Sequence, residues 1–92
     1  MTLYSQTKIV SELCHTKDWN FENNALVKHF KLETFSKAIG FIVQVGLVAE
    51  KQNHHPELFN VYNKVSIRLT THDANGVTKK DFDLAIAIDQ IV

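Results

Sequence analysis

The stretch "LFNVYNKVSIRLTTH", residues 58–72, predicts two neighbouring strands of a sheet. In its second half, apolar and polar residues alternate from Val65 to Leu69, which is the two-residue period of a strand with one buried face. The shorter first half, residues 58–62, is followed by Asn63-Lys64, where the chain can turn back. The pattern therefore predicts a hairpin in an antiparallel sheet that has one face covered and one face open.

The segments on either side of this hairpin complete an α+β pattern. Residues 25–32 also alternate, and the turn residues before them suit a hairpin with residues 19–21. Three further segments have apolar residues at helical spacing and a capping residue at their start: 5–14, 35–52 and the segment from 78 onward. The order helix, two strands, helix, two strands, helix predicts a four-stranded antiparallel sheet with three helices packed on one face.

The predicted helix over residues 35–52 has a wider apolar arc than contact with one sheet face requires. We expect its core side to carry six residues, namely Phe35, Ala38, Ile39, Ile42, Val45 and Ala49. Phe41 and Val48 extend the arc on one side, and Val43 and Leu47 extend it on the other. Gln44 and Lys51 mark the polar side. Two explanations stay open: the helix is sunk in its own core, or part of the arc meets another subunit.

The composition fits a single globular domain over residues 1–92, with 45% hydrophobic and 22% charged residues. Ten basic residues balance ten acidic ones, so there is no basic surplus to hold nucleic acid or an anionic membrane, and we expect neither as a partner. Cys14 is the single cysteine and cannot form an internal disulfide. The first ten residues lack the pattern of a signal peptide, so we expect a cytoplasmic protein.

Three histidines are the candidate chemical groups. His54 and His55 are adjacent and precede Pro56, the only proline, and His72 stands at the end of the alternating strand. A strand end and a helix end can lie close together in an antiparallel arrangement, so the three imidazoles can meet at one rim. Three roles stay open: surface residues without a task, a three-histidine metal site, or metal-free acid–base groups.

Three other residues allow two interpretations each. Asp81 ends the segment "TKKD", residues 78–81, which matches a capping box at the start of the last helix. Glu50 lies one turn before His54 and either orients an imidazole or is simply solvated. Trp19 belongs to the core or stacks against a flat ligand.

Taken together, these residues resemble the signature of the pterin-4a-carbinolamine dehydratases. The signature positions match at every spacing: Glu50, His54-His55-Pro56, Tyr62, His72 and Asp81. The likeness extends to "FNVYNKV" at 59–65 and "TTH" at 70–72, and covers about residues 15–92. Many members of that family carry Asp where Asn53 stands and Arg where Lys80 stands, and neither difference removes an imidazole.

The resemblance implies an activity. Members of this family dehydrate 4a-hydroxytetrahydrobiopterin to quinonoid dihydropterin in the recycling of tetrahydrobiopterin, and the resemblance implies no metal and no cofactor. It implies a homodimer or homotetramer, and in some animal members a homeodomain transcription factor as partner. A transcription coactivator, present also in the nucleus, is therefore one alternative. A pterin-handling role outside amino acid hydroxylation is another.

The resemblance also implies roles for particular residues. His54, His55 and His72 would be catalytic, and Asp81 would be the supporting carboxylate that orients His72. Residues expected at the substrate are Trp19, Glu50, His54, His55, Pro56, Thr71, His72, Asp73 and Ala74.

Overall fold

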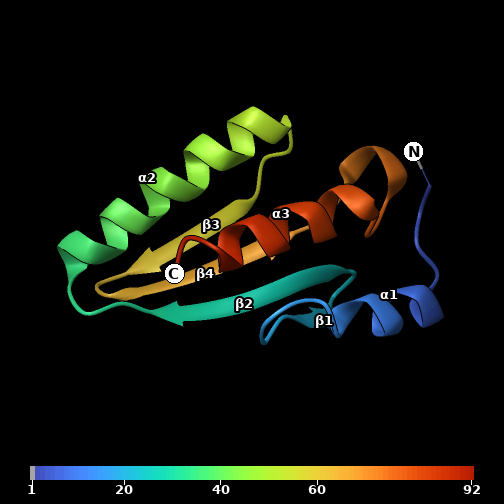
Figure 1. The fold of residues 1–92 in the computed structure, drawn as a ribbon, viewed down its shortest axis with the longest axis horizontal. Helices are drawn as coiled ribbons and strands as arrows, with labels where there is room; N and C mark the ends of the chain where they lie inside the picture. Colours follow the sequence, from blue (N-terminus) through green and yellow to red (C-terminus); the bar gives the residue numbers. More distant parts are fainter. Residues whose placement is uncertain (1) are drawn as a thin grey trace.

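A computed structural model describes residues 2–92, which form one four-stranded antiparallel sheet with strand order β1-β2-β4-β3 (Figure 1). The strands are β1 (Asn20–Glu22), β2 (Ala25–Lys31), β3 (Glu57–Val61) and β4 (Lys64–Leu69). Met1, the first residue of the predicted domain, lies outside the described residues. The predicted fold class, a four-stranded antiparallel sheet with three helices, is confirmed.

Both hairpins turn through residues with positive φ. Asn23 and Asn24 join β1 to β2 at φ values of 50° and 62°, a region that asparagine tolerates better than most residues. Between β3 and β4 the chain turns at Tyr62-Asn63, one residue earlier than predicted, because Lys64 already pairs in the sheet. Asn63 is fixed there by two hydrogen bonds with the backbone of Leu32, at 2.8 and 2.9 Å.

Three α-helices complete the fold: α1 (Gln6–Leu13), α2 (Phe35–Gln52) and α3 (Lys79–Asp89). The hydroxyls of Ser5, Thr34 and Thr78 accept hydrogen bonds from backbone amides in the first turns, so all three predicted caps are confirmed. In Figure 1, α2 and α3 cover one face of the sheet and α1 lies beside β1. Within residues 2–92, no helix combines the length and apolar character needed to cross a membrane.

The core lies between the sheet and the helices. Strands β2 and β4 contribute Leu26, Phe30, Val65, Ile67 and Leu69, all buried. From α2, the buried residues are Ala38, Phe41, Val45 and Ala49. The predicted core side of this helix is therefore partly wrong, because Phe35 and Ile39 are exposed. The helix is rotated so that Phe41 packs on Phe30, with 4.8 Å between their ring centroids.

Candidate active site

A polar cleft of about 300 Å³ lies where the end of α2, the end of β4 and the start of α3 meet. Its lining residues are Asn53, His54, His55, Thr70, Thr71, His72, Asp73 and Lys80. The structure therefore brings the three predicted imidazoles to one cleft. His72 belongs to a short 3-10 helix, η1 (His72–Ala74), that directly follows this end of the sheet.

The way α2 ends separates the two adjacent histidines. Asn53 takes a left-handed conformation with φ of 53°, and the His54 amide donates back to the Ala49 carbonyl at 3.1 Å. This is the backbone reversal that commonly terminates helices. It turns the His54 side chain inward, 10% exposed, and leaves that of His55 64% exposed. The two neighbouring imidazoles therefore meet very different surroundings.

His54 is held by a buried carboxylate. Its Nε2 lies 2.6 Å from Asp81 Oδ1, and Asp81 is fully buried. Asp81 Oδ2 accepts hydrogen bonds from the Thr78 amide and the Thr71 hydroxyl, both at 2.8 Å. The first of these belongs to the predicted capping box, which is confirmed. One carboxylate thus caps α3 and fixes an imidazole of the cleft.

The expectation that Asp81 orients His72 is wrong, because its imidazole partner is His54. The chain changes conformation between the two residues. Thr71 is extended and buried beyond the end of β4, whereas His72 begins the η1 turn and is exposed. Within residues 2–92, no side-chain hydrogen bond reaches the His72 ring.

Glu50 orients an imidazole, and that imidazole is His55. Glu50 Oε1 lies 2.8 Å from His55 Nε2, and both side chains are exposed. Water and salt screen such a pair, so it contributes little to stability. Glu50 itself is outside the described lining of the cleft.

Trp19 is in the core and does not line the cleft, so its predicted contact with substrate is not supported. The Trp19 indole N–H donates to Asp89 Oδ1 at 2.9 Å, and Lys28 Nζ contacts the same oxygen at 2.9 Å. Its ring packs edge-on against Phe30. Among the described residues, Pro56 and Ala74 also stay outside the lining, although both are next to residues that form it.

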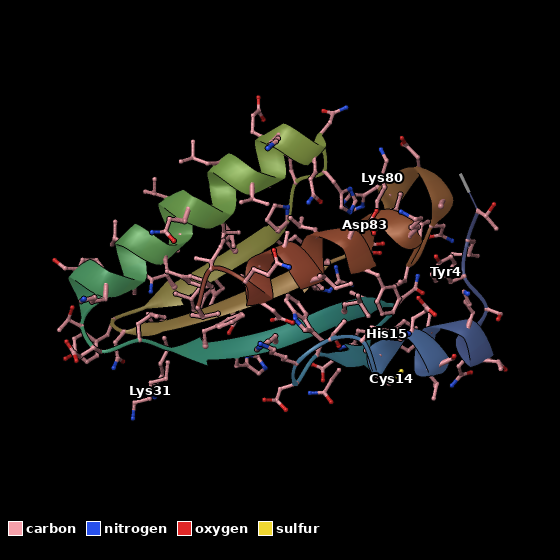
Figure 2. The ribbon with its side chains drawn as sticks, in the orientation of Figure 1. Tyr4, Cys14, His15, Lys31, Lys80 and Asp83 are labelled. Atoms are coloured by element: carbon pink, nitrogen blue, oxygen red, sulfur yellow. The ribbon has the colours of Figure 1, made fainter. Side chains whose placement is uncertain are left out.

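Three residues that line the cleft were not predicted as site residues: Asn53, Thr70 and Lys80. A signal existed for Lys80, which lies on the first turn of α3 beside Asp81, and Figure 2 shows it close to the η1 turn. Lys80 is the one cation of the described lining. The neighbouring Lys79 points elsewhere and bonds Asp83 at 2.8 Å, and this hydrogen bond raises the pKa of Lys79.

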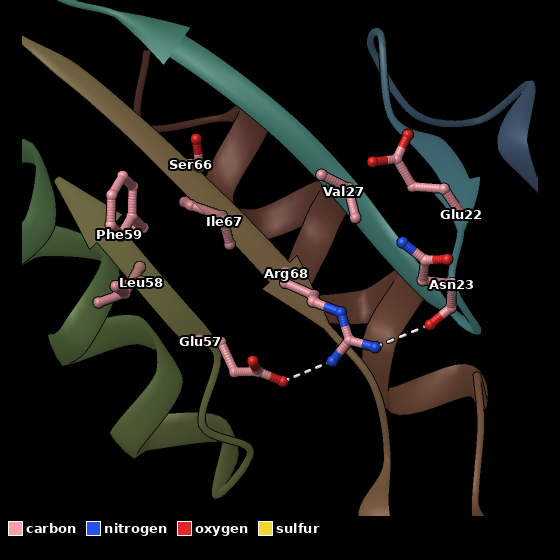
Figure 3. Close-up of a pocket in the computed structure, with 9 residues that line it drawn as sticks. All are labelled: Glu22, Asn23, Val27, Glu57, Leu58, Phe59, Ser66, Ile67 and Arg68. Atoms are coloured by element: carbon pink, nitrogen blue, oxygen red, sulfur yellow. Dashed lines mark hydrogen bonds and ion pairs between the residues drawn. The ribbon is translucent and has the colours of Figure 1, made fainter. Parts of the chain in front are cut away.

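A second hollow, of about 400 Å³, lies on the sheet between β3, β4 and the β1–β2 hairpin (Figure 3). Arg68 crosses it, donating to Glu57 Oε2 at 2.6 Å and to the Asn23 carbonyl at 2.7 Å. Its described lining contains neither histidine nor cysteine, and Arg68 is already paired with Glu57. The histidine cleft is therefore the candidate active site.

Fold and cleft together define a small α+β protein with a site suited to proton transfer. The family model described as "Pterin 4 alpha carbinolamine dehydratase" matches residues 2–91. A putative pterin-4-alpha-carbinolamine dehydratase of Chloroflexus aurantiacus is 46% identical over 92 residues, covering 100% of this chain and 99% of that protein. One of Solibacter usitatus is 46% identical over 90 residues, covering 98% and 95%.

A solved structure agrees with these relatives. The crystal structure of a transcriptional coactivator/pterin dehydratase from Brucella melitensis superposes with a TM-score of 0.93 at 37% identity, covering 98% of each chain. The chain belongs to the pterin-4-alpha-carbinolamine dehydratase family. The predicted resemblance is confirmed, and the membership supports dehydratase activity.

Proposed function

We propose that this protein dehydrates 4a-hydroxytetrahydrobiopterin to quinonoid dihydropterin and water, with histidines of the cleft as the acid and base and without a metal or cofactor. The observation that carries the proposal is the convergence of His54, His55 and His72 on one polar cleft, in a chain matched to this family over residues 2–91.

The reaction needs two proton transfers. The C4a–O bond breaks, a C4a=N5 double bond forms, N5 gives up its proton, and the leaving hydroxyl takes one to depart as water. One group must therefore accept a proton while another donates. Imidazole, with an unperturbed pKa of about 6.5, serves in either role near neutral pH.

The different surroundings of the three rings support different roles for them. His54 has its Nε2 at the buried Asp81 carboxylate, so its other ring nitrogen, Nδ1, is left to exchange a proton with the substrate. A carboxylate behind an imidazole fixes the ring's orientation and stabilises its protonated form, as in other enzymes that use histidine. His55 is exposed and exchanges protons with solvent readily. His72 in η1 and Lys80 in α3 line the same cleft and then hold the substrate in place.

The pathway and partners belong to the same proposal. We place the reaction in tetrahydrobiopterin recycling, in the cytoplasm, with a homodimer or homotetramer as the working form. The coactivator alternative is not favoured, because several relatives are named as dehydratases and the cleft keeps its three histidines. The similar Brucella melitensis protein is a transcriptional coactivator/pterin dehydratase, so a role with a transcription-factor partner is the second candidate.

The direct test uses purified protein and synthetic 4a-hydroxytetrahydropterin, whose decay is followed by absorbance. We expect decay well above the spontaneous rate, and a rate near the spontaneous one for the His54→Ala/His55→Ala double variant. Val10→Ala, at an exposed position on α1 outside the cleft lining, is the matched control. A wild-type protein that leaves the spontaneous rate unchanged contradicts the proposal.

A chelator arm of the same assay tests the metal-free mechanism. Imidazoles that carry protons need a free nitrogen, so we expect the rate to be the same before and after treatment with a strong chelator. An activity that is lost to the chelator and restored by added zinc would overturn this part of the proposal.

A further inference from the structure

Thr71 joins the strand end to the carboxylate behind His54. It is only 4% exposed, and its hydroxyl makes two hydrogen bonds of 2.8 Å, to Asp81 Oδ2 and to the Thr78 hydroxyl. Thr71 follows β4, whereas Thr78 and Asp81 are the cap and first turn of α3. A contact between two chain segments is therefore made at a single buried oxygen.

The donors and acceptors in this cluster can be assigned. The ionised carboxylate of Asp81 only accepts, so the Thr71 hydroxyl must donate to it. A hydroxyl has one hydrogen, so Thr71 accepts in its other bond and the Thr78 hydroxyl donates. The Thr78 oxygen in turn accepts from the Lys80 amide. The result is a directed chain that ends on Asp81 Oδ2.

The same assignment decides which nitrogen of a neutral His54 ring carries the hydrogen. With Oδ2 occupied by the Thr71 hydroxyl and the Thr78 amide, Oδ1 is the oxygen that faces His54. A neutral His54 ring must then carry its hydrogen on Nε2 to make the 2.6 Å contact. Its Nδ1 is left unprotonated, which is the form needed to accept a proton. Without the Thr71 hydroxyl, Oδ2 keeps only the Thr78 amide as a donor, so the carboxylate that orients the His54 ring is held less firmly.

We propose that Thr71 is a positioning residue rather than a substrate-binding one: its hydroxyl fixes the Asp81 carboxylate and thereby the orientation of His54. This inference rests on the proposed function of His54. A capping box needs only Thr78 and Asp81, so helix capping does not account for the bond to Thr71. Both bonds of the Thr71 hydroxyl are internal, which leaves it no hydrogen to offer a substrate.

The test compares Thr71→Val, which keeps the shape and removes the hydroxyl, with Thr71→Ser, which keeps the hydroxyl. We expect Thr71→Val to lower kcat by about tenfold, the equivalent of one hydrogen bond to a charged group, with KM nearly unchanged. Thr71→Ser should recover most of kcat. Thr16→Val is the matched control, since its hydroxyl bonds the Leu13 carbonyl away from the cleft. A raised KM with normal kcat in Thr71→Val indicates substrate binding and overturns the proposal.

A second readout needs no substrate. Nitrogen NMR should show neutral His54 of the wild-type protein as the Nε2–H tautomer, and the Nε2 resonance should shift in Thr71→Val, where the carboxylate that it contacts is held less firmly, but not in Thr71→Ser. A wild-type His54 with its hydrogen on Nδ1 overturns the proposal outright. If the wild-type protein lacks dehydratase activity, the proposed function fails, while this measurement still decides the role of Thr71.

Discussion

His54 and His55 are neighbours in the chain but are expected to respond differently to the same substitution. Each change to alanine should lower the dehydratase rate by about 10²–10⁴-fold if that ring is the essential proton carrier. His54→Ala also leaves a buried oxygen of Asp81 without its partner, which should cost about 1–3 kcal/mol in the free energy of unfolding. His55→Ala removes only an exposed pair and should leave stability within about 0.5 kcal/mol.

Rate measurements and denaturant unfolding on the same set of variants check this difference. The double variant should lose less than the product of the two single losses, because groups that act as a unit are not additive. His72→Ala completes the set and should raise KM more than it lowers kcat. Unchanged rates in all three single variants would remove the histidines from the mechanism and favour the binding-protein alternative.

Asp81 and Asp83 provide a matched pair on α3. Asp81 is buried and accepts from His54, Thr71 and Thr78, whereas Asp83 is exposed and bonds the exposed Lys79. Asp81→Ala should therefore lower the unfolding free energy by about 3 kcal/mol and reduce turnover as strongly as His54→Ala does. Asp83→Ala should leave both the unfolding free energy and the turnover nearly unchanged. An Asp81→Ala protein with lowered stability but normal turnover would show that this carboxylate only caps the helix.

Patterns that depend on neighbouring residues predicted the elements well. The three helix caps and the alternation of β2 and β4 are local, and all were found where the sequence indicates. The rotation of α2 was not predictable, because an arc with apolar residues nearly all round has no unique buried side. The pairing of Asp81 with His54 joins residues 27 positions apart. One signal for it was present: alternation through Leu69 turns Thr71, rather than His72, inward.

The turn between β3 and β4 stores strain at Tyr62. A bulky residue at φ of 51° is unfavourable by about 1–2 kcal/mol, and the Tyr62 side chain is exposed, so little packing offsets this. Asn60 holds the turn by donating to the Tyr62 and Lys64 carbonyls. Tyr62→Asn, which keeps a residue tolerant of this conformation, should raise the unfolding free energy by about 1 kcal/mol.

The reciprocal change is the control for Tyr62. Asn23 has a similar φ of 50° in the β1–β2 turn, so Asn23→Tyr should destabilise by a similar amount. Thermal or denaturant unfolding measures the change in unfolding free energy for both variants. A loss of stability in Tyr62→Asn would mean that the tyrosine ring makes contacts beyond this single chain, and a change of oligomeric state should then accompany it.

The outer side of α2 leaves the isolated chain with an uncovered apolar stripe. Phe35, Ile39, Val43 and Leu47 recur every fourth residue and are between 41% and 67% exposed. Four large apolar side chains in a row on one helix are typical of a surface that is covered by another molecule. We expect a second copy of the chain to cover the stripe. A chain of 92 residues buries only a modest core, so burying this surface between two copies would add to its stability. This agrees with the wide arc noted in the sequence.

The stripe predicts a stable homo-oligomer that a single charge dissociates. Val43→Glu or Leu47→Glu places a carboxylate within the stripe, where it would lose its hydration without gaining a partner if a second copy covers the stripe. Gln44→Glu adds the same charge on the polar side of the helix and should leave the assembly intact. Light scattering with size-exclusion chromatography measures the mass of all three variants and of the unmodified protein. The interface on α2 is ruled out if the unmodified protein is a monomer at micromolar concentration, or if Gln44→Glu dissociates the assembly as readily as Leu47→Glu.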